Sequence, residues 1–145
     1  MSETSTTFTC PLVVRSYELD SFGHVNHAVL LHYLEHARFL ALEEGGFGHA
    51  DLERRGWGVF VVRAEVDYLG EVLLGDELVV RTSADEPRRS SMVLTQEIVR
   101  EDESEEVLLR ARITAVWVGE NRRPMRVPEE VRAAFGLDRE TDASS

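Results

Sequence analysis

The segment from His27 to Glu44 constrains the fold more than any other part of this sequence, because its pattern predicts one long helix that is hydrophobic on nearly every side. One set of residues recurs at helical spacing and lies on one side: Leu30, Leu34, Ala37 and Ala41. The other sides also carry hydrophobic residues: Val29, Leu31, Tyr33, Phe39, Leu40 and Leu42. A helix that is hydrophobic all round is normally buried. The rest of the chain is therefore expected to surround this helix.

Both ends of the predicted helix carry recognisable signals. Asn26 is a good N-cap, because its side-chain oxygen can accept a hydrogen bond from a free N–H of the first turn. Gly45 and Gly46 follow the last predicted turn and favour its termination. The helix should therefore begin at about His27.

Five segments rich in valine, isoleucine, leucine and threonine predict strands: residues 8–17, 57–69, 76–84, 91–100 and 107–118. Turn signals separate the later ones, at Gly75-Asp76, Glu86-Pro87 and residues 101–103. Short helices are expected at residues 50–55 and 128–135. Consecutive strands are most simply joined as antiparallel hairpins. The predicted fold is α+β, with a five-stranded antiparallel sheet wrapped around the long helix.

Residues 1–145 are expected to form one domain, with residues 1–7 and 139–145 as frayed tails. The hydrophobic runs are shorter than the roughly 20 residues that span a bilayer. The first residues also lack the charged and hydrophobic pattern of an export signal. We therefore expect a cytoplasmic protein without membrane association.

The charge of the chain excludes several functions. Its net charge of −11 disfavours nonspecific binding to nucleic acids, which requires a basic surface. All 16 basic residues are arginine, so Schiff-base chemistry on lysine is excluded. Cys10 is the only cysteine, so the chain cannot form an internal disulfide. Any anionic substrate must be met locally by arginines.

The residues around the helix start form a specific pattern. Residues 20–27 read Asp-Ser-Phe-Gly-His-Val-Asn-His, and residues 33–38, inside the helix, read Tyr-Leu-Glu-His-Ala-Arg. This pattern and its spacing resemble the 4-hydroxybenzoyl-CoA thioesterase branch of the hot-dog family. The resemblance extends more weakly over residues 8–130. It implies the hot-dog fold and hydrolysis of an acyl-CoA thioester to a free acid and CoA, with no metal and no cofactor beyond the CoA of the substrate.

The resemblance also implies roles for individual residues. Asp20 is the catalytic carboxylate, either as a nucleophile or as a general base that activates water. The backbone N–H of His27, seven residues later, is the oxyanion donor, since the first N–H groups of a helix lack internal partners. The residues between them are expected to contact substrate: Gly23, His24, Val25 and Asn26. Each also has a structural interpretation, such as a turn glycine, a loop histidine or a helix cap.

Further substrate contacts are expected elsewhere. Val59, Val61 and Arg63 alternate along the second strand, and their face should line the acyl pocket. Arg88, Arg89 and Ser91 resemble a basic-then-serine turn that meets the CoA phosphates in some relatives. In the resembled family the active site lies between two subunits, so we expect at least a homodimer, and a homotetramer as a dimer of dimers.

Three alternatives remain open. Residues 32–36 read His-Tyr-Leu-Glu-His, which is also a zinc-protease signature, although no third ligand is evident. The same fold could act on an acyl-carrier-protein thioester, against which the acidic composition weighs. A non-catalytic acyl-CoA-binding protein is the third, and the intact Asp20 argues against it.

Overall fold

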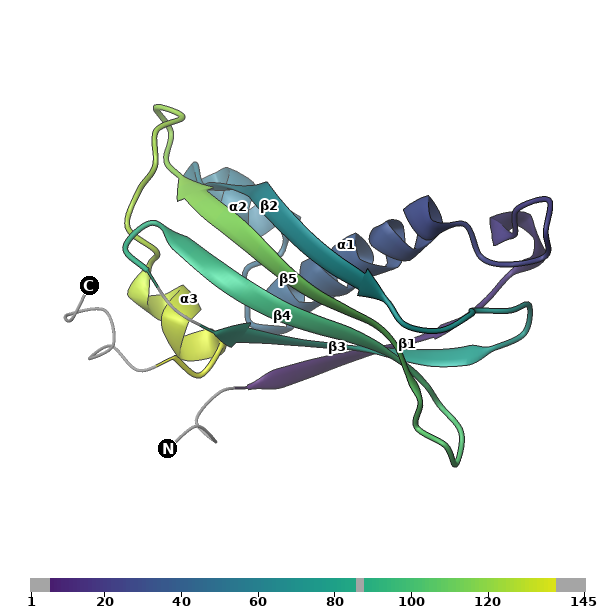
Figure 1. Ribbon diagram of the computed structural model, residues 1–145. Coiled ribbons are helices and arrows are strands. Elements are labelled where there is room, and N and C mark those ends of the chain that lie inside the picture. The colour runs from purple at the N-terminus through teal and green to yellow at the C-terminus, as the bar shows by residue number, and fades with distance from the viewer. Residues whose placement is uncertain (1–5, 86–87, 138–145) are drawn as a thin grey trace.

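The computed structural model describes residues 6–85 and 88–137, and its strands form one antiparallel sheet (Figure 1). The strands are β1 (Thr7–Val13), β2 (Gly58–Tyr68), β3 (Glu77–Asp85), β4 (Ser91–Arg100) and β5 (Val107–Val118). They lie in the order β1-β3-β4-β5-β2, so β1 and β2 are the edge strands. The predicted antiparallel sheet of five strands is confirmed.

Helix α1 (His27–Glu44) has 18 residues and lies across one face of this sheet (Figure 1). The Asn26 side chain caps it by accepting the Ala28 N–H at 2.7 Å, as predicted. Two shorter helices follow, α2 (His49–Arg55) after α1 and α3 (Glu129–Ala134) after β5. Apart from β1, the bounds of every element agree with the predicted ones to within one residue, and those of β4 and β5 agree at both ends. The turn expected at Glu86-Pro87 lies outside the described residues.

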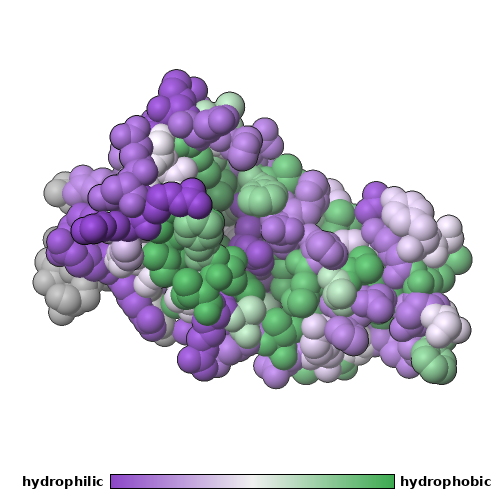
Figure 2. All heavy atoms as spheres, turned by 90° about the horizontal axis from the view of Figure 1, so that it is seen from above, coloured by the Kyte–Doolittle hydropathy of each residue, from purple (hydrophilic) through white to green (hydrophobic). Residues whose placement is uncertain are grey.

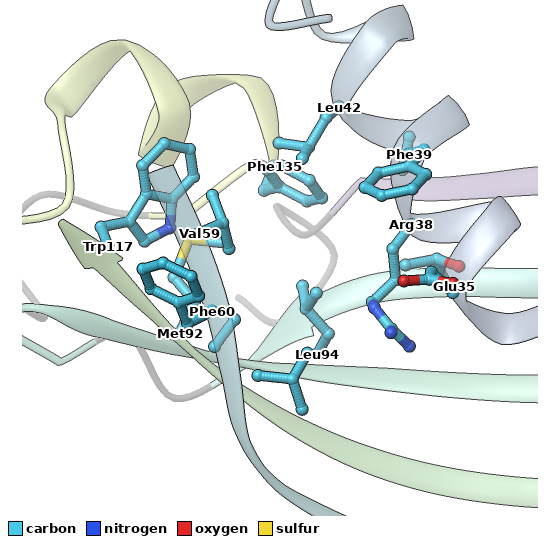
Figure 3. Close-up of a pocket in the computed structure, with 14 residues that line it drawn as sticks. Glu35, Arg38, Phe39, Leu42, Val59, Phe60, Met92, Leu94, Trp117 and Phe135 are labelled. Atoms are coloured by element: carbon cyan, nitrogen blue, oxygen red, sulfur yellow. The ribbon is translucent and has the colours of Figure 1, made fainter. Parts of the chain in front are cut away.

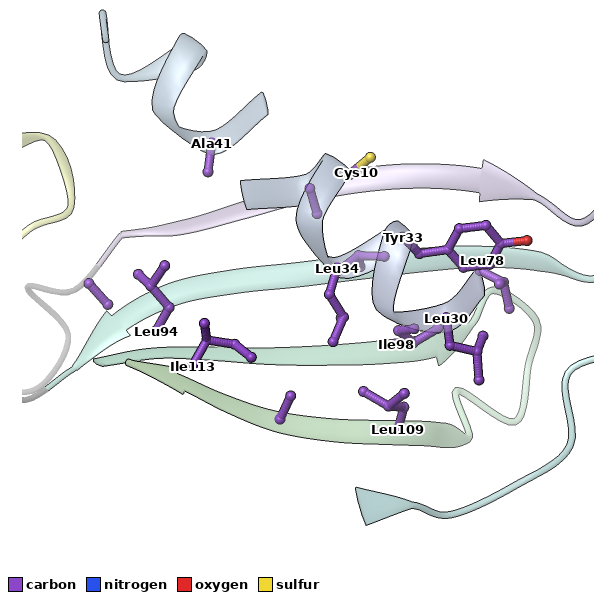
Figure 4. Close-up of a cluster of buried hydrophobic side chains, with 14 of the residues drawn as sticks. Cys10, Leu30, Tyr33, Leu34, Ala41, Leu78, Leu94, Ile98, Leu109 and Ile113 are labelled. Carbon is purple, nitrogen blue, oxygen red and sulfur yellow. The ribbon is translucent and has the colours of Figure 1, made fainter. Parts of the chain in front are cut away.

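The core forms where one side of α1 meets the sheet (Figure 4). Leu30, Leu34 and Ala41 of α1 are buried, as their spacing predicted. They pack over side chains of β3, β4 and β5 that include Leu78, Ile98 and Leu109. Burial of these side chains is the main force that holds α1 on the sheet.

The opposite side of α1 is open in the single chain. Leu31 and Phe39 are 40% and 61% exposed, so the expectation of a helix buried on every side is wrong for one chain alone. The physical reason is that the sheet lies against one face of α1 and leaves the other uncovered. None of the helices among the described residues combines the length and the hydropathy of a membrane span.

The first strand is shorter than predicted, because β1 ends at Val13 rather than continuing to residue 17. The Arg15 N–H donates to the Glu18 carboxylate at 2.9 Å, and the chain turns into a short 3-10 segment, η2 (Ser16–Glu18). At the other end, Thr7 belongs to β1 and the Thr6 N–H donates to the Phe135 carbonyl at 3.1 Å. These two residues are therefore part of the fold and not of the frayed tail expected over residues 1–7.

The two edge strands differ in their capacity to pair with another chain. β1 is short and carries Pro11, which has no N–H to donate. β2 has 11 residues and pairs only with β5, which leaves its other edge open among the described residues. Phe60, Val61 and Val62 on β2 are about half exposed (48%, 47% and 62%). The hydrophobic surface that includes β2 and α1 is visible in Figure 2.

Candidate active site

The loop between η2 and α1 is closed by its own backbone. The Asp20 N–H donates to the His24 carbonyl at 2.8 Å, and the Gly23 N–H donates to the Asp20 carbonyl at 3.1 Å. Leu19 and Val25 form a bridge beside this pair. Gly23 has φ +82°, a conformation that a side chain disfavours, which explains the glycine in this turn. The closed loop holds Asp20 next to the helix start.

The Asp20 carboxylate is half-buried and fixed at one of its oxygens. Its Oδ1 accepts the N–H groups of Phe22 at 2.9 Å and His24 at 3.2 Å. No described residue donates to Oδ2. The turn-forming and the reactive roles of Asp20 are therefore compatible, since each uses a different oxygen.

The first turn of α1 leaves one N–H open beside this loop. Asn26 uses its side chain for the Ala28 N–H, and its carbonyl accepts from Val29 and Leu30 at 2.9 and 3.2 Å. Among the described residues, the His27 N–H has no acceptor. This group lies at the positive end of the helix dipole, where it can stabilise a negatively charged oxygen. The His27 ring meets the Tyr68 ring edge-on at 6.0 Å.

A buried carboxylate ties the loop to the helix. Glu18 is 8% exposed and accepts the Tyr33 hydroxyl at 2.6 Å and the Arg15 guanidinium at 2.8 Å. Its carbonyl accepts the Asn26 N–H at 3.3 Å. Burial alone raises the pKa of Glu18, but the hydrogen bonds from Arg15 and Tyr33 outweigh it, so this pKa lies below its usual 4.5. Burial and the Glu18 carboxylate raise the pKa of Tyr33.

The other residues predicted within the loop have distinct placements. The His24 Nε2 lies 3.7 Å from the Glu71 carboxylate, and its backbone bonds Asp20, which favours the loop interpretation. Val25 is buried, and its N–H donates to the Val72 carbonyl at 2.9 Å. The Val25 side chain therefore packs inside the protein. Asn26 is the helix cap.

A cavity of about 290 Å³ opens between the second half of α1 and the sheet (Figure 3). Val59, Phe60 and Val61 line it from β2. That Val59 and Val61 contact the acyl group stays a prediction. Its other walls are mostly hydrophobic and include Phe39, Leu42, Met92, Leu94, Trp117 and Phe135. The loop at residues 19–26 holds the carboxylate that we consider reactive and is called the reactive loop. Within one chain the cavity is separated from it, because Glu35, the α1 residue of the cavity wall nearest to His27 in sequence, is about 12 Å from His27 along the helix.

The prediction that Arg63 lies on the same face as Val61 is wrong. The pairing of β2 with β5 shifts between Val61 and Arg63, so that Val61 pairs with Ala115 and Arg63 with Thr114. Adjacent β5 residues face opposite sides of the sheet. This bulge therefore turns Arg63 to the outer face, where it donates to the Glu65 carboxylate at 3.1 Å.

The cavity wall also holds a polar group that the sequence did not reveal. Arg38 donates to the Gln96 side chain at 2.9 Å, and Gln96, which is fully buried, donates to Thr82 and to the Leu34 carbonyl at 2.9 and 3.0 Å. Burial lowers the pKa of Arg38. The Gln96 partner lies 58 residues from Arg38, so no local pattern could have indicated the pair.

The predicted phosphate-binding residues lie at the opposite end of the sheet from Asp20. Arg88 and Arg89 are exposed in the turn before β4, which begins at Ser91. The reactive loop lies at the other end of the sheet, where His24 forms a β-bridge with Leu73. A ten-residue strand such as β4 is about 30 Å long, and this length separates the arginine turn from the reactive loop. The structure places these arginines near the cavity end and does not bring them to Asp20 of the same chain.

The arginine turn is joined to a second basic segment. The Val127 N–H donates to the Arg89 carbonyl at 2.8 Å, and Arg132 donates to the Arg88 carbonyl. Burial and the charge of Arg126 lower the pKa of Arg132. A local basic cluster thus exists within a strongly acidic chain.

The histidines of the zinc-like pattern are exposed on α1, and the His32 Nδ1 lies 3.9 Å from the Glu35 carboxylate. Within residues 6–85 and 88–137, no three histidine, cysteine or carboxylate side chains are grouped so that they could hold a metal ion. The described residues therefore supply no third ligand for His32 and His36.

A tight carboxylate loop before a helix that packs on a five-stranded antiparallel sheet is the arrangement expected from the resemblance to hot-dog thioesterases. The family model described as "Thioesterase-like superfamily" matches residues 14–135. The chain belongs to the Thioesterase-like superfamily, and the resemblance drawn from residues 20–38 is confirmed at the level of the family.

Individual relatives make the placement more specific. Acyl-acyl carrier protein thioesterase ATL2 of Arabidopsis thaliana is 33% identical over 129 residues, which cover 86% of this chain and 66% of the relative. The chain thus spans slightly less than two thirds of that protein. Acyl-CoA thioesterase YbgC of Haemophilus influenzae is 30% identical over 130 residues, which cover 88% of this chain and 93% of the relative.

A solved structure supports the same placement. The PA2801 protein of Pseudomonas aeruginosa has a TM-score of 0.79 and 31% sequence identity. The match covers 88% of this chain and 96% of that structure. The similarity therefore extends over most of the described fold.

The lowered pKa of Glu18 predicts a pH-dependent contribution to stability. An ionised Glu18 stabilises the fold above its usual pKa of 4.5, and this contribution disappears as the pH falls through the lower pKa of the folded state. The difference in free energy of unfolding between wild type and Glu18→Gln should therefore be largest at neutral pH and shrink as the pH falls below 4.5. Urea unfolding across this range measures it.

Glu103→Gln, in the exposed turn between β4 and β5, is the matched control and should show no such pH-dependent difference. A Glu18→Gln difference that stays constant over the same range would contradict the assigned ionisation.

Proposed function

We propose that this protein hydrolyses acyl-CoA thioesters to free acids and CoA. The observation that carries this proposal concerns two groups near the start of α1, Asp20 Oδ2 and the His27 N–H. Neither has a hydrogen-bond partner among the described residues, so both are available to a substrate. A thioester carbonyl develops negative charge on oxygen when it is attacked, and the helix N–H is suited to stabilise that charge. The YbgC relative, named an acyl-CoA thioesterase, supports the same substrate class.

Asp20 supplies the attacking group in one of two ways. Its Oδ2 can attack the carbonyl carbon, which gives an anhydride that water then hydrolyses. Alternatively it can take a proton from a water molecule that attacks the same carbon. In both routes the thiolate of CoA leaves, and the acid is released. We propose no metal and no cofactor beyond the CoA portion of the substrate.

We further propose that a homodimer completes the site. Two copies of β2 that pair across a two-fold axis run antiparallel, so the Gly58 end of one strand lies beside the Tyr68 end of the other. The cavity lies near Val59 and Val61, whereas His27 lies against Tyr68. This pairing would place the cavity of one chain close to Asp20 of its partner. It would also cover the exposed hydrophobic residues of β2 and close its open edge. A tetramer of two such dimers, and a cytoplasmic location, stay predictions.

The same arrangement gives the basic cluster a role. Arg88 and Arg89 lie at the cavity end of the sheet, so in the dimer they would approach the reactive loop of the partner. Guanidinium groups bind phosphate oxygens well, because their forked donors match the geometry of the phosphate. We propose that these arginines, with Ser91, bind the CoA phosphates.

An acyl-carrier-protein thioester is the second candidate substrate. The 33% identity to a plant acyl-carrier-protein thioesterase favours it. The net charge of −11 opposes docking of an acidic carrier protein. Both substrates would use the same Asp20 chemistry.

Asp20→Asn should lower kcat for acyl-CoA hydrolysis by about two orders of magnitude or more, because the amide cannot supply the attacking carboxylate. Its free energy of unfolding should change little, since the amide oxygen can still accept the Phe22 and His24 N–H groups. A thiol-release assay measures the rate. Asp102→Asn, in the exposed turn between β4 and β5, is the control and should retain activity. Wild-type turnover by Asp20→Asn would refute the assignment.

Arg89→Glu should raise KM for acyl-CoA about tenfold, through loss of a phosphate contact and repulsion by the new carboxylate. It should leave KM for a short pantetheine thioester nearly unchanged, because that substrate lacks the nucleotide. Glu101→Lys, which changes charge in the turn between β4 and β5, serves as control. An unchanged KM for acyl-CoA in Arg89→Glu would contradict the phosphate contact. A higher kcat/KM for acyl-carrier-protein thioesters than for CoA thioesters would identify the carrier protein as the preferred partner.

A shared site predicts complementation between two inactive variants. Asp20→Asn keeps an intact cavity, and Leu42→Trp, which fills the cavity from α1, keeps an intact Asp20. After the two chains are unfolded together and refolded, about a quarter of wild-type activity should return, since half of the dimers are mixed and each has one complete site. Sedimentation confirms the dimers. A site within one chain would restore no activity.

A further inference from the structure

Two buried ionisable side chains beside the reactive loop take no part in the proposed chemistry. Glu18 is 8% exposed and Tyr33 is 4% exposed. The Tyr33 hydroxyl, which Figure 4 shows directed away from α1, donates to the Glu18 carboxylate at 2.6 Å. Burying a carboxylate is costly, and a hydrophobic pair of similar volume often holds a fold equally well or better. Stability alone therefore does not account for this pair.

Glu18 is connected to both groups of the proposed site. Asp20 follows it by two residues in the chain. The Glu18 carbonyl accepts the N–H of Asn26 at 3.3 Å, and Asn26 caps α1 immediately before His27. Tyr33 adds a second connection from α1 itself, about 9 Å along the helix from His27. The position of Asp20 relative to the His27 N–H is thus fixed by the backbone of the loop and by one side-chain hydrogen bond.

Arg15 fixes the Glu18 carboxylate from the other side. Its N–H donates to Oε1 at 2.9 Å and its guanidinium to Oε2 at 2.8 Å. Hydrogen bonds to a charged group are short and directional, whereas hydrophobic contacts tolerate small shifts. With these donors the carboxylate has one position, so the bond from Tyr33 fixes the distance between loop and helix. A displacement of reacting groups by about 1 Å can lower a rate about 100-fold.

We propose that Tyr33 and Glu18 are positioning residues for thioester hydrolysis, and that their hydrogen bond holds the Asp20 carboxylate at the distance from the His27 N–H that the attack requires. This inference rests on the proposed function, because it names how the same site is held. Neither residue touches the reacting atoms, so the pair acts through Asp20 and His27. Loss of the bond should lower kcat and leave KM for acyl-CoA nearly unchanged, since the cavity and the arginine turn remain intact.

Replacing both partners by hydrophobic side chains separates positioning from stability. The double variant Glu18→Leu/Tyr33→Phe leaves neither group buried and unpaired, and the Arg15 side chain, which is 54% exposed, can be solvated. Its free energy of unfolding should therefore stay close to that of wild type. Its kcat should nevertheless fall at least about tenfold at a temperature well below its melting transition. Calorimetry measures the stability and a thiol-release assay the rate.

A kcat of the folded double variant within about twofold of wild type would overturn the proposal. Binding of a non-hydrolysable acyl-CoA thioether gives an independent reading of the substrate site. Its affinity should be unchanged in the double variant, because only the attacking group has moved. Weaker binding in step with the lower kcat would assign the pair a general structural role and would also overturn the proposal.

The single variant Tyr33→Phe keeps Glu18 paired with Arg15 and provides a second measurement. It should lower kcat in the wild-type background and have a much smaller effect on the residual rate of Asp20→Asn, because a positioning residue cannot act through a carboxylate that is absent. If the two substitutions instead reduce the rate by independent factors, Tyr33 does not act through Asp20.

Tyr17→Phe is the matched control. It removes a hydroxyl from the same short segment, η2, where the Tyr17 ring is 76% exposed. Its kcat and KM should equal those of wild type. Absence of any thioester hydrolysis by wild type would refute the proposed function, whereas hydrolysis that does not depend on the Tyr33–Glu18 bond would refute only the positioning role.

Discussion

The packing of α1 against a single face of the sheet is the constraint on which the rest of this structure depends. Burial of Leu30, Leu34 and Ala41 fixes the helix in place. It also fixes where the first N–H groups of α1 point and where the second half of α1 leaves space above the sheet. The uncovered side, with Phe39 and the open edge of β2, follows from the same geometry. The proposed oxyanion donor, the cavity proposed for the acyl group and the proposed surface for a partner chain are thus three consequences of one packing arrangement.

The Glu18 carboxylate converts this packing into a defined position for the reactive loop. A buried carboxylate is costly unless every oxygen is satisfied, and here Arg15 and Tyr33 satisfy it. Its backbone also holds Asn26, the residue that caps α1. The strand side and the helix side of the site are therefore joined through one residue. Loss of either partner would leave a buried charge uncompensated, so this network holds the loop and the start of α1 in one arrangement.

The parts of the site that the sequence predicted are those determined by local rules. The bounds of α1, the Asn26 cap and the Asp20 turn depend on residues a few positions apart. The missed features depend on pairing between distant segments. The face of Arg63 is decided by a bulge against β5, and the anchoring of Arg38 by a glutamine on β4. The hydrogen bond from Tyr33 to Glu18 joins residues 15 positions apart, so it too depends on packing and not on a local pattern.

The separation of the reactive loop from the cavity within one chain has a chemical consequence. If two chains share each site, the proposed catalytic carboxylate and the cavity proposed for the acyl group belong to different subunits. The cavity can then change its selectivity without altering the loop, since α1 transmits only rigid packing between its two ends. Family members with the same loop before the helix could in this way act on different acyl groups. In the proposed mechanism, the start of α1 determines the reaction, and the space that the second half of α1 and the sheet enclose determines the acyl group.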